Sequence, residues 1–133
     1  MPPTEQSTVS RPGVDLAVFV TGRRDAPTLV LMHGWPDTHE LWTHVVPLLA
    51  DRYRVVTYDA RGAGASTTPN RTRDFRLSEL AADLRAVIDH VSPSAPVHVL
   101  AHDWGAVEAW EAVAEADAPT RIASYTSVSG PNL

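Results

Sequence analysis

Short apolar runs alternate with amphipathic stretches along the 133-residue chain. Leu16, Val18 and Val20 recur at every second position of residues 14–21, which is typical of a half-buried β-strand. Compact apolar runs rich in β-branched residues predict further strands, of the kind buried in parallel sheets. These runs are residues 28–32, 54–58, 97–101 and 121–129.

Three stretches repeat apolar residues at the spacing of an α-helix. The clearest covers residues 77–91. A second covers residues 38–49, with Asp37 as its expected N-cap and a kink or restart at Pro47. The third begins at Trp104 and runs to about residue 116. Its pattern places four residues towards the sheet, Val107, Trp110, Val113 and Ala114, and three towards water, Glu108, Glu111 and Glu115.

This order of strands and helices predicts an α/β fold, with a mostly parallel sheet and helices on both of its faces. Residues 13–133 form the expected core, a single domain or part of one. Residues 1–12 are polar and contain three prolines. They therefore predict a flexible N-terminal arm that leads into the first edge strand.

Composition narrows the classes of function. Apolar residues make up 44% of the chain and charged residues 20%, as in soluble globular proteins. The net charge of −5 disfavours nucleic acid and anionic membranes as partners. The absence of cysteine excludes a thiol nucleophile and a thiolate metal site. With no leader pattern and no apolar run near the ~20 residues of a membrane span, we expect a cytoplasmic protein.

One corner carries the strongest chemical signal. Residues 97–107 read Val-His-Val-Leu-Ala-His-Asp-Trp-Gly-Ala-Val, a strand that passes into a helix at Asp103. Ala101 and Gly105 flank Asp103 two residues to either side, which predicts a nucleophile elbow with Asp in place of the usual Ser. The alternative is that Asp103 is only the N-cap of the helix, a position that favours Asp.

An aspartate at this corner implies different chemistry from a serine. A hydroxyl needs a base to remove its proton, whereas an aspartate side chain is already a carboxylate at neutral pH. It can attack saturated carbon and form an alkyl ester. Hydrolysis of that ester then needs water, a general base and an oxyanion hole.

A second motif, His33-Gly34-Trp35-Pro36, also lies between a strand and a helix. Gly34 lets the backbone approach a reacting atom closely, and Pro36 fixes the turn, with a cis bond as one possibility. We expect the backbone N–H groups of Trp35 and Trp104 to form the oxyanion hole. The alternative is an ordinary strand-to-helix turn.

The remaining glycines and histidines carry no cofactor signal. Residues 62–66 read Gly-Ala-Gly-Ala-Ser but lack the third glycine of a dinucleotide site, so we interpret them as a structural loop in which Asp59 and Arg61 make local hydrogen bonds. The histidines lack the spacing of metal ligands. His39, His44 and His90 are expected on the surface, and His102 is a poor candidate for the base. We predict neither a metal nor a cofactor.

The three motifs in this order resemble the N-terminal half of an α/β-hydrolase fold protein of the epoxide hydrolase and haloalkane dehalogenase group. They are His33-Gly34-Trp35-Pro36, residues 59–66, and His102-Asp103-Trp104-Gly105, and the resemblance covers about residues 12–133. It implies that Asp103 is the nucleophile and that Trp35 and Trp104 supply the oxyanion donors. The Trp104 indole is then expected to face the substrate, and His33, Gly34, Pro36, His102 and Gly105 are expected to support the loops.

The resemblance further implies that lid tyrosines, a second acid and the general-base histidine follow Leu133. We therefore expect the parent enzyme to open a small apolar epoxide to a diol, with water as second substrate, and the 133-residue chain alone not to turn over. More distantly, the chain is similar to hydrolase domains fused ahead of a short-chain dehydrogenase, which implies a C-terminal fused domain as partner.

Two other functions stay open. Haloalkane dehalogenases of this group often carry Asn at the position of Trp35, so Trp35 favours the epoxide hydrolase interpretation over the dehalogenase. A non-catalytic interaction module of a larger protein is the other alternative. In that case the last strand would offer an open apolar edge for pairing.

Overall fold

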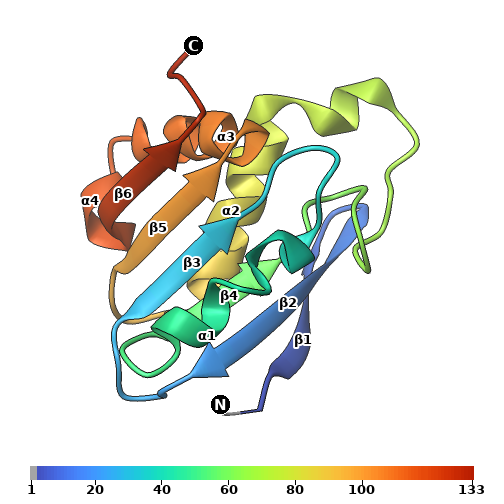
Figure 1. Ribbon diagram of the computed structural model, residues 1–133. Coiled ribbons are helices and arrows are strands. Elements are labelled where there is room, and N and C mark those ends of the chain that lie inside the picture. The colour runs from blue at the N-terminus through green and yellow to red at the C-terminus, as the bar shows by residue number, and fades with distance from the viewer. Residues whose placement is uncertain (1–2) are drawn as a thin grey trace.

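The computed structural model describes residues 3–133, in which six strands form one sheet (Figure 1). The strands lie in the order β1-β2-β4-β3-β5-β6. β1 and β2 run antiparallel to their neighbours, and the other four strands are parallel. The predicted α/β class is confirmed. The strands are β1 (Glu5–Arg11), β2 (Val14–Gly22), β3 (Thr28–Met32), β4 (Arg54–Tyr58), β5 (Val97–His102) and β6 (Ile122–Val128).

Helices lie on both faces of the sheet (Figure 1). The long helix α2 (Leu77–Val91) and α3 (Trp104–Val113) pack against each other on one face. The opposite face carries the short 3-10 helix η1 (His39–Trp42) and α1 (Val46–Leu49). No helix among residues 3–133 is long and apolar enough to cross a membrane. Two further short helices are η2 (Thr72–Phe75) and α4 (Ala118–Arg121).

Successive side chains of the strand β3 point to opposite faces of the sheet and so belong to two separate hydrophobic clusters. Val30 and Met32 face the larger cluster, which includes Leu84 and Ile88 of α2. Leu29 and Leu31 belong to a smaller cluster on the opposite side, with Trp42 and Val55. Complete burial of one such side chain contributes about 1.5–3 kcal/mol, so the central strands are held from both faces.

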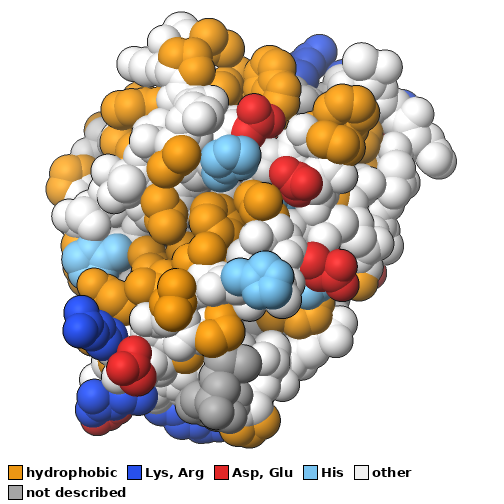
Figure 2. All heavy atoms as spheres, viewed as in Figure 1, with side chains coloured by type: hydrophobic (Ala, Val, Ile, Leu, Met, Phe, Trp, Pro, Cys, Tyr) orange, Lys and Arg blue, Asp and Glu red, His pale blue; other side chains and the backbone are white. Residues whose placement is uncertain are grey.

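The face that carries α1 is less completely covered. Hydrophobic side chains gather across its middle in Figure 2, and Leu48 of α1 remains 76% exposed. The helices that the described residues 3–133 place on this face are η1 and α1, of four residues each, and short helices cover little of a sheet. The larger, better sealed cluster is therefore on the side of α2 and α3.

The expectation of a flexible arm at residues 1–12 is wrong for most of its length. Glu5–Arg11 form the edge strand β1, which pairs with β2 from Glu5↔Val20 to Arg11↔Val14. Val9 is buried, and Arg11 Nη1 contacts Asp83 Oδ1 at 2.8 Å. An edge strand keeps one face in water, so its polar sequence did not exclude pairing. Residues 1–2 lie outside the described part of the chain.

The stretch 38–49 is also not one helix. It divides into η1 and α1, and Pro47 occupies the first turn of α1, where a missing N–H is tolerated. The expected restart at Pro47 is therefore confirmed. The N-cap is Thr38 rather than Asp37, because the Thr38 hydroxyl accepts the Glu40 N–H at 3.2 Å.

The third helix differs from its prediction in length and in the face it buries. α3 ends at Val113, and Pro119 lies in the first turn of the unpredicted helix α4. Glu108, expected in water, is buried, whereas Ala114 is exposed. The helix packs against α2 as well as the sheet, so its buried face is wider than the sequence pattern suggested.

Candidate active site

Asp103 forms the whole turn between β5, which ends at His102, and α3, which begins at Trp104. Its backbone has φ 60° and ψ −129°, a conformation that L-residues rarely adopt. Such strain costs on the order of 1–3 kcal/mol and is concentrated at functional sites. A Cβ on Gly105 would lie 2.4 Å from the His33 carbonyl oxygen, so only glycine allows α3 to pass this close to β3.

The Asp103 side chain does not cap the helix. It accepts no capping hydrogen bond, whereas its backbone carbonyl accepts the Ala106 N–H at 3.0 Å. A Cβ placed on Gly34 would lie 2.6 Å from Asp103 Oδ2. The carboxyl group therefore lies against the backbone of Gly34. Asp103 thus occupies the N-cap position of α3 without capping the helix through its side chain.

The loop His33-Gly34-Trp35-Pro36 meets this corner because β3 and β5 are neighbouring parallel strands. The Asp37 N–H closes the turn on the Gly34 carbonyl at 2.9 Å, and the Trp35–Pro36 bond is cis. The space over Gly34 is bounded by Asp103 and by the Trp104 amide nitrogen, 2.9 Å from a Cβ placed there. Within residues 3–133, neither the Trp35 nor the Trp104 N–H donates a hydrogen bond. These two amides are therefore free to bind an oxygen atom.

His33 is held as a neutral ring. Its Nδ1 donates to the Gly34 carbonyl at 2.8 Å, and its Nε2 accepts the Ala60 N–H at 3.0 Å. Burial lowers the pKa of His33, which also favours the neutral form. Because both ring nitrogens are engaged, His33 supports the loop and has no nitrogen left to act as a base.

Among residues 3–133, none of the other histidines makes a hydrogen bond to the Asp103 carboxyl group either. His102 is half-buried, and its Nδ1 is buried without a partner among residues 3–133. His44 and His90 are exposed, as expected. The surface expectation for His39 is wrong, since its ring stacks on Phe19 and its Nδ1 lies 2.7 Å from Asp59 Oδ1.

The Gly62-Ala63-Gly64 loop is structural, as its sequence predicts. Asp59 is completely buried and accepts N–H groups from His39 and Ala65. Burial alone would raise the pKa of Asp59, but these hydrogen bonds outweigh it and lower the pKa. Arg61 forms a two-pronged pair with Asp83 of α2, both bonds being 2.7 Å. The loop is therefore fixed to η1 and to α2.

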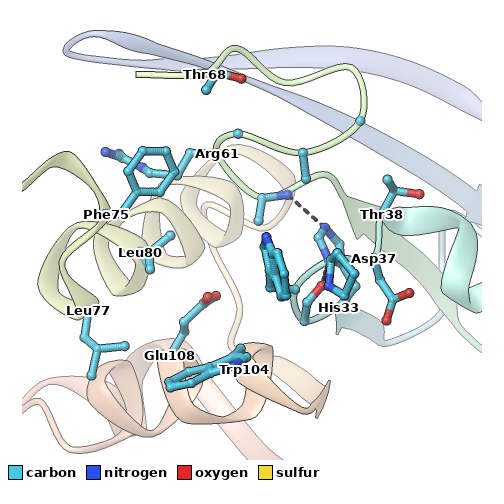
Figure 3. Close-up of a pocket in the computed structure, with 17 residues that line it drawn as sticks. His33, Asp37, Thr38, Arg61, Thr68, Phe75, Leu77, Leu80, Trp104 and Glu108 are labelled. Carbon is cyan, nitrogen blue, oxygen red and sulfur yellow. Dashed lines mark hydrogen bonds between the residues drawn. The ribbon is translucent and has the colours of Figure 1, made fainter. Parts of the chain in front are cut away.

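A cavity of about 740 Å³ opens between the two loops and the helices (Figure 3). Trp35, 79% exposed, and Trp104, 50% exposed, both line it. Asp103 is not part of the cavity wall, but its neighbours Gly34 and Trp104 are. The cavity therefore ends beside the carboxyl group. Its wall includes the apolar residues Pro36, Phe75, Leu77 and Leu80.

Glu108 was not among the expected site residues, yet it also lines this cavity. Only 8% of the residue is exposed. Burial raises the pKa of Glu108 to about 8, and the charge of Asp83 acts in the same direction. The sequence held one usable signal, since Glu108 is four residues after Trp104 and so lies on the same helix face.

The comparison with known proteins decides the family. A family model described as the alpha/beta hydrolase fold matches residues 27–133. The chain belongs to the α/β hydrolase fold family. Among residues 3–133, no three His, Asp or Glu side chains are grouped so that they could hold a metal ion.

Relatives of this α/β hydrolase chain include proteins named as epoxide hydrolases. Epoxide hydrolase A of Mycobacterium tuberculosis is 39% identical over 133 residues, which cover 98% of this chain and 40% of that protein. The crystal structure of epoxide hydrolase VrEH1 from Vigna radiata has a TM-score of 0.88 at 30% identity, covering 98% of this chain and 41% of that one. The resemblance to the epoxide hydrolase group is thereby confirmed.

A longer relative has a different name. The probable oxidoreductase EphD of Mycobacterium tuberculosis is 51% identical over 135 residues, which cover 99% of this chain and 23% of that protein. The chain thus spans between about a quarter and two-fifths of the length of these three proteins.

Proposed function

We propose that Asp103 is the nucleophile of an epoxide hydrolase and that its corner is a nucleophile elbow. The observation that carries the proposal is the strained backbone of Asp103, with the carboxyl group uncapped and lying against Gly34. A capping residue needs neither feature, whereas a nucleophile needs to project from the turn. The names of the relatives supply the substrate class.

The proposed first step forms an ester. A carboxylate oxygen of Asp103 attacks an epoxide carbon, and the ring C–O bond breaks with its electron pair moving to the epoxide oxygen. That oxygen takes a proton from water, which leaves a hydroxyalkyl ester on Asp103. The apolar wall beside the carboxyl group suits the hydrocarbon part of such a substrate.

The proposed second step releases a diol. Water adds to the ester carbonyl, and the negative oxygen that develops is stabilised by the free N–H groups of Trp35 and Trp104. A base must remove a proton from that water. The tetrahedral intermediate then collapses: the bond from the acyl carbon to the diol oxygen breaks, that oxygen takes a proton, and the Asp103 carboxylate is restored. Within residues 3–133, no imidazole hydrogen-bonds to Asp103, and His33 is fully engaged. We propose that the 133-residue chain stops at the ester.

The test is the mass of the intact chain after incubation with styrene oxide. We expect one adduct per chain with the full mass of the epoxide, because ring opening expels no atom. Asp103→Asn removes the nucleophilic carboxylate, so its chain should gain no adduct. Repeated diol formation by the 133-residue chain would contradict the proposed arrest at the ester.

A bromoalkane distinguishes the dehalogenase alternative in the same assay. Attack on a bromoalkane expels bromide, so the adduct would lack the halogen and free bromide would appear in solution. Trp35 in place of the expected halide-binding Asn leads us to predict adducts from epoxides only. Failure of both reagents would favour the non-catalytic module.

We do not assign the oxidoreductase activity in the name of EphD to these residues. The glycines after β4 hold a loop on buried Asp59, where a Cβ on Gly64 would lie 2.4 Å from the Asp59 carboxyl carbon. The next long helix, α2, begins only at Leu77. A dinucleotide site needs a helix to begin directly after its glycines. We propose that any such activity belongs to a fused domain.

A further inference from the structure

Glu108 places a carboxyl group in the part of the cavity wall formed by Trp104, Leu77 and Leu80. In Figure 3 its carboxyl points into the cavity, between Trp104 on one side and Leu77 and Leu80 on the other. The residue is buried, with only 8% of its surface exposed. Its carboxyl group makes no hydrogen bond among residues 3–133, and its oxygens are not among the fully enclosed polar atoms that lack a partner, so they open into the cavity.

The charges facing Glu108 do not compensate it. From α2, Asp83 acts on it as a like charge. From β4, Tyr58 is a buried phenol whose pKa is raised by burial and by Glu108. The arginine on the cavity wall, Arg61, is occupied by Asp83 and by the Asp74 carbonyl. From β6, the Tyr125 hydroxyl donates to Ala106 instead. β5 brings His98 and His102, and His98 is bound to Ser124.

We propose that Glu108 selects epoxides that carry a second oxygen, to which the protonated carboxyl donates a hydrogen bond inside the cavity. The inference rests on the proposed function of Asp103. The raised pKa supports it, because a carboxyl that stays protonated at pH 7 has an O–H to donate. A substrate that supplies the acceptor would satisfy a group that the protein itself leaves unpaired.

The spacing along α3 sets where this oxygen lies. Glu108 follows Trp104 by four residues, a rise of about 6 Å along the helix. The acceptor is therefore expected farther along the cavity than the carbon that Asp103 attacks, by a distance on the order of that rise, which a flexible chain of about six or seven bonds can span. The preferred class is an aliphatic epoxide with a ketone oxygen at that distance.

A matched pair of reagents tests the inference. Adduct formation is followed by intact mass with 7,8-epoxyoctan-2-one and with 1,2-epoxyoctane, which lacks the ketone. We expect the ketone to react about threefold to tenfold faster, the range that one net hydrogen bond supports. The preference should fade above about pH 8, as Glu108 ionises.

Three variants assign the preference to this residue. Glu108→Gln keeps a donor and should keep the preference, whereas Glu108→Leu should lose it while still reacting with 1,2-epoxyoctane. Glu111→Gln changes an exposed residue of the same helix and serves as the control. Equal rates for the two epoxides in the unchanged chain, or a preference that survives Glu108→Leu, would overturn the inference.

A binding measurement separates this inference from the proposed function. Octan-2-one has the ketone and no epoxide, and its binding is followed through the tryptophan fluorescence of the chain, because Trp35 and Trp104 both line the cavity. We expect Glu108→Leu to weaken its binding about threefold to tenfold. If no epoxide forms an adduct but this loss appears, only the proposed function fails. If adducts form and this loss is absent, only the Glu108 inference fails.

Discussion

Asp103 combines a strained backbone with a side chain that makes no capping hydrogen bond to the helix it precedes. At φ 60° the backbone would suit glycine better, and the carboxyl makes no capping bond that would offset the strain. The surrounding contacts hold it in place, since its N–H donates to the Val128 carbonyl at 2.9 Å. The residue therefore costs stability, as expected where function rather than folding fixes the choice of amino acid.

Asp103→Gly tests this balance. Glycine adopts the observed φ without strain, so we expect the free energy of unfolding to rise by about 1 kcal/mol, measured by urea denaturation. The same variant should form no adduct with an epoxide. Asp103→Ala keeps the strained Cβ and provides the matched control. A loss of stability in Asp103→Gly would show that the carboxyl does stabilise the corner.

At the scale of elements, α3 carries a buried acid that makes stability depend on pH. The pKa of Glu108 rises from its ordinary 4.5 to about 8 on folding. Below pH 4.5 the Glu108 carboxyl is protonated in both the folded and the unfolded chain, so its ionisation does not reduce the free energy of unfolding. Between the two values the unfolded chain releases a proton that the folded chain retains, so the folded state loses stability as the pH rises.

Glu108→Gln removes this titration. Its free energy of unfolding relative to the unchanged chain is expected to grow by on the order of 1 kcal/mol per pH unit between pH 5 and pH 7. Denaturation curves at several pH values measure this difference, with Glu111→Gln as the exposed control. A difference that does not vary with pH would mean that Glu108 is ionised in the folded chain.

The elements also show how far the sequence could predict this fold. The strands β3 and β4 and the helix α2 have the predicted bounds. The two strands are buried along almost their whole length and are therefore mostly apolar, and α2 buries one face and therefore repeats apolar residues at helical spacing. β1 was missed because an edge strand does not need an apolar pattern. The buried side of α3 was misjudged because the helix also packs on α2, a contact distant in sequence.

The candidate site was also predicted in part, and one of its residues was missed. Its corner and loop follow from local chemistry, since small residues and a proline mark sharp turns. The positive φ of Asp103 and its approach to Gly34 agree with that expectation. Glu108 was not predicted, because its burial depends on the packing of α3 against α2, which is distant in sequence. Acidic residues on a helix usually face water.

At the scale of the whole molecule, the sheet brings together groups that are far apart in the chain. The loop after β3 and the turn after β5 meet because those strands are parallel neighbours, while α2 and α3 supply the cavity wall. The proposed nucleophile, the two free amides and the apolar part of the cavity wall thus come from separate segments that the folded sheet brings together. Ligand sites in α/β folds lie at this same carboxyl edge.

The most direct test locates the ester within the chain. After reaction with styrene oxide, cleavage at Arg85 and Arg121 releases residues 86–121, which contain both Asp103 and Glu108. Fragmentation of that peptide in a mass spectrometer identifies the modified carboxyl group. The account predicts the full mass of the epoxide on Asp103 alone and no modified peptide from Asp103→Asn. An ester on Glu108, or equal labelling of the Asp103→Asn chain, would contradict it.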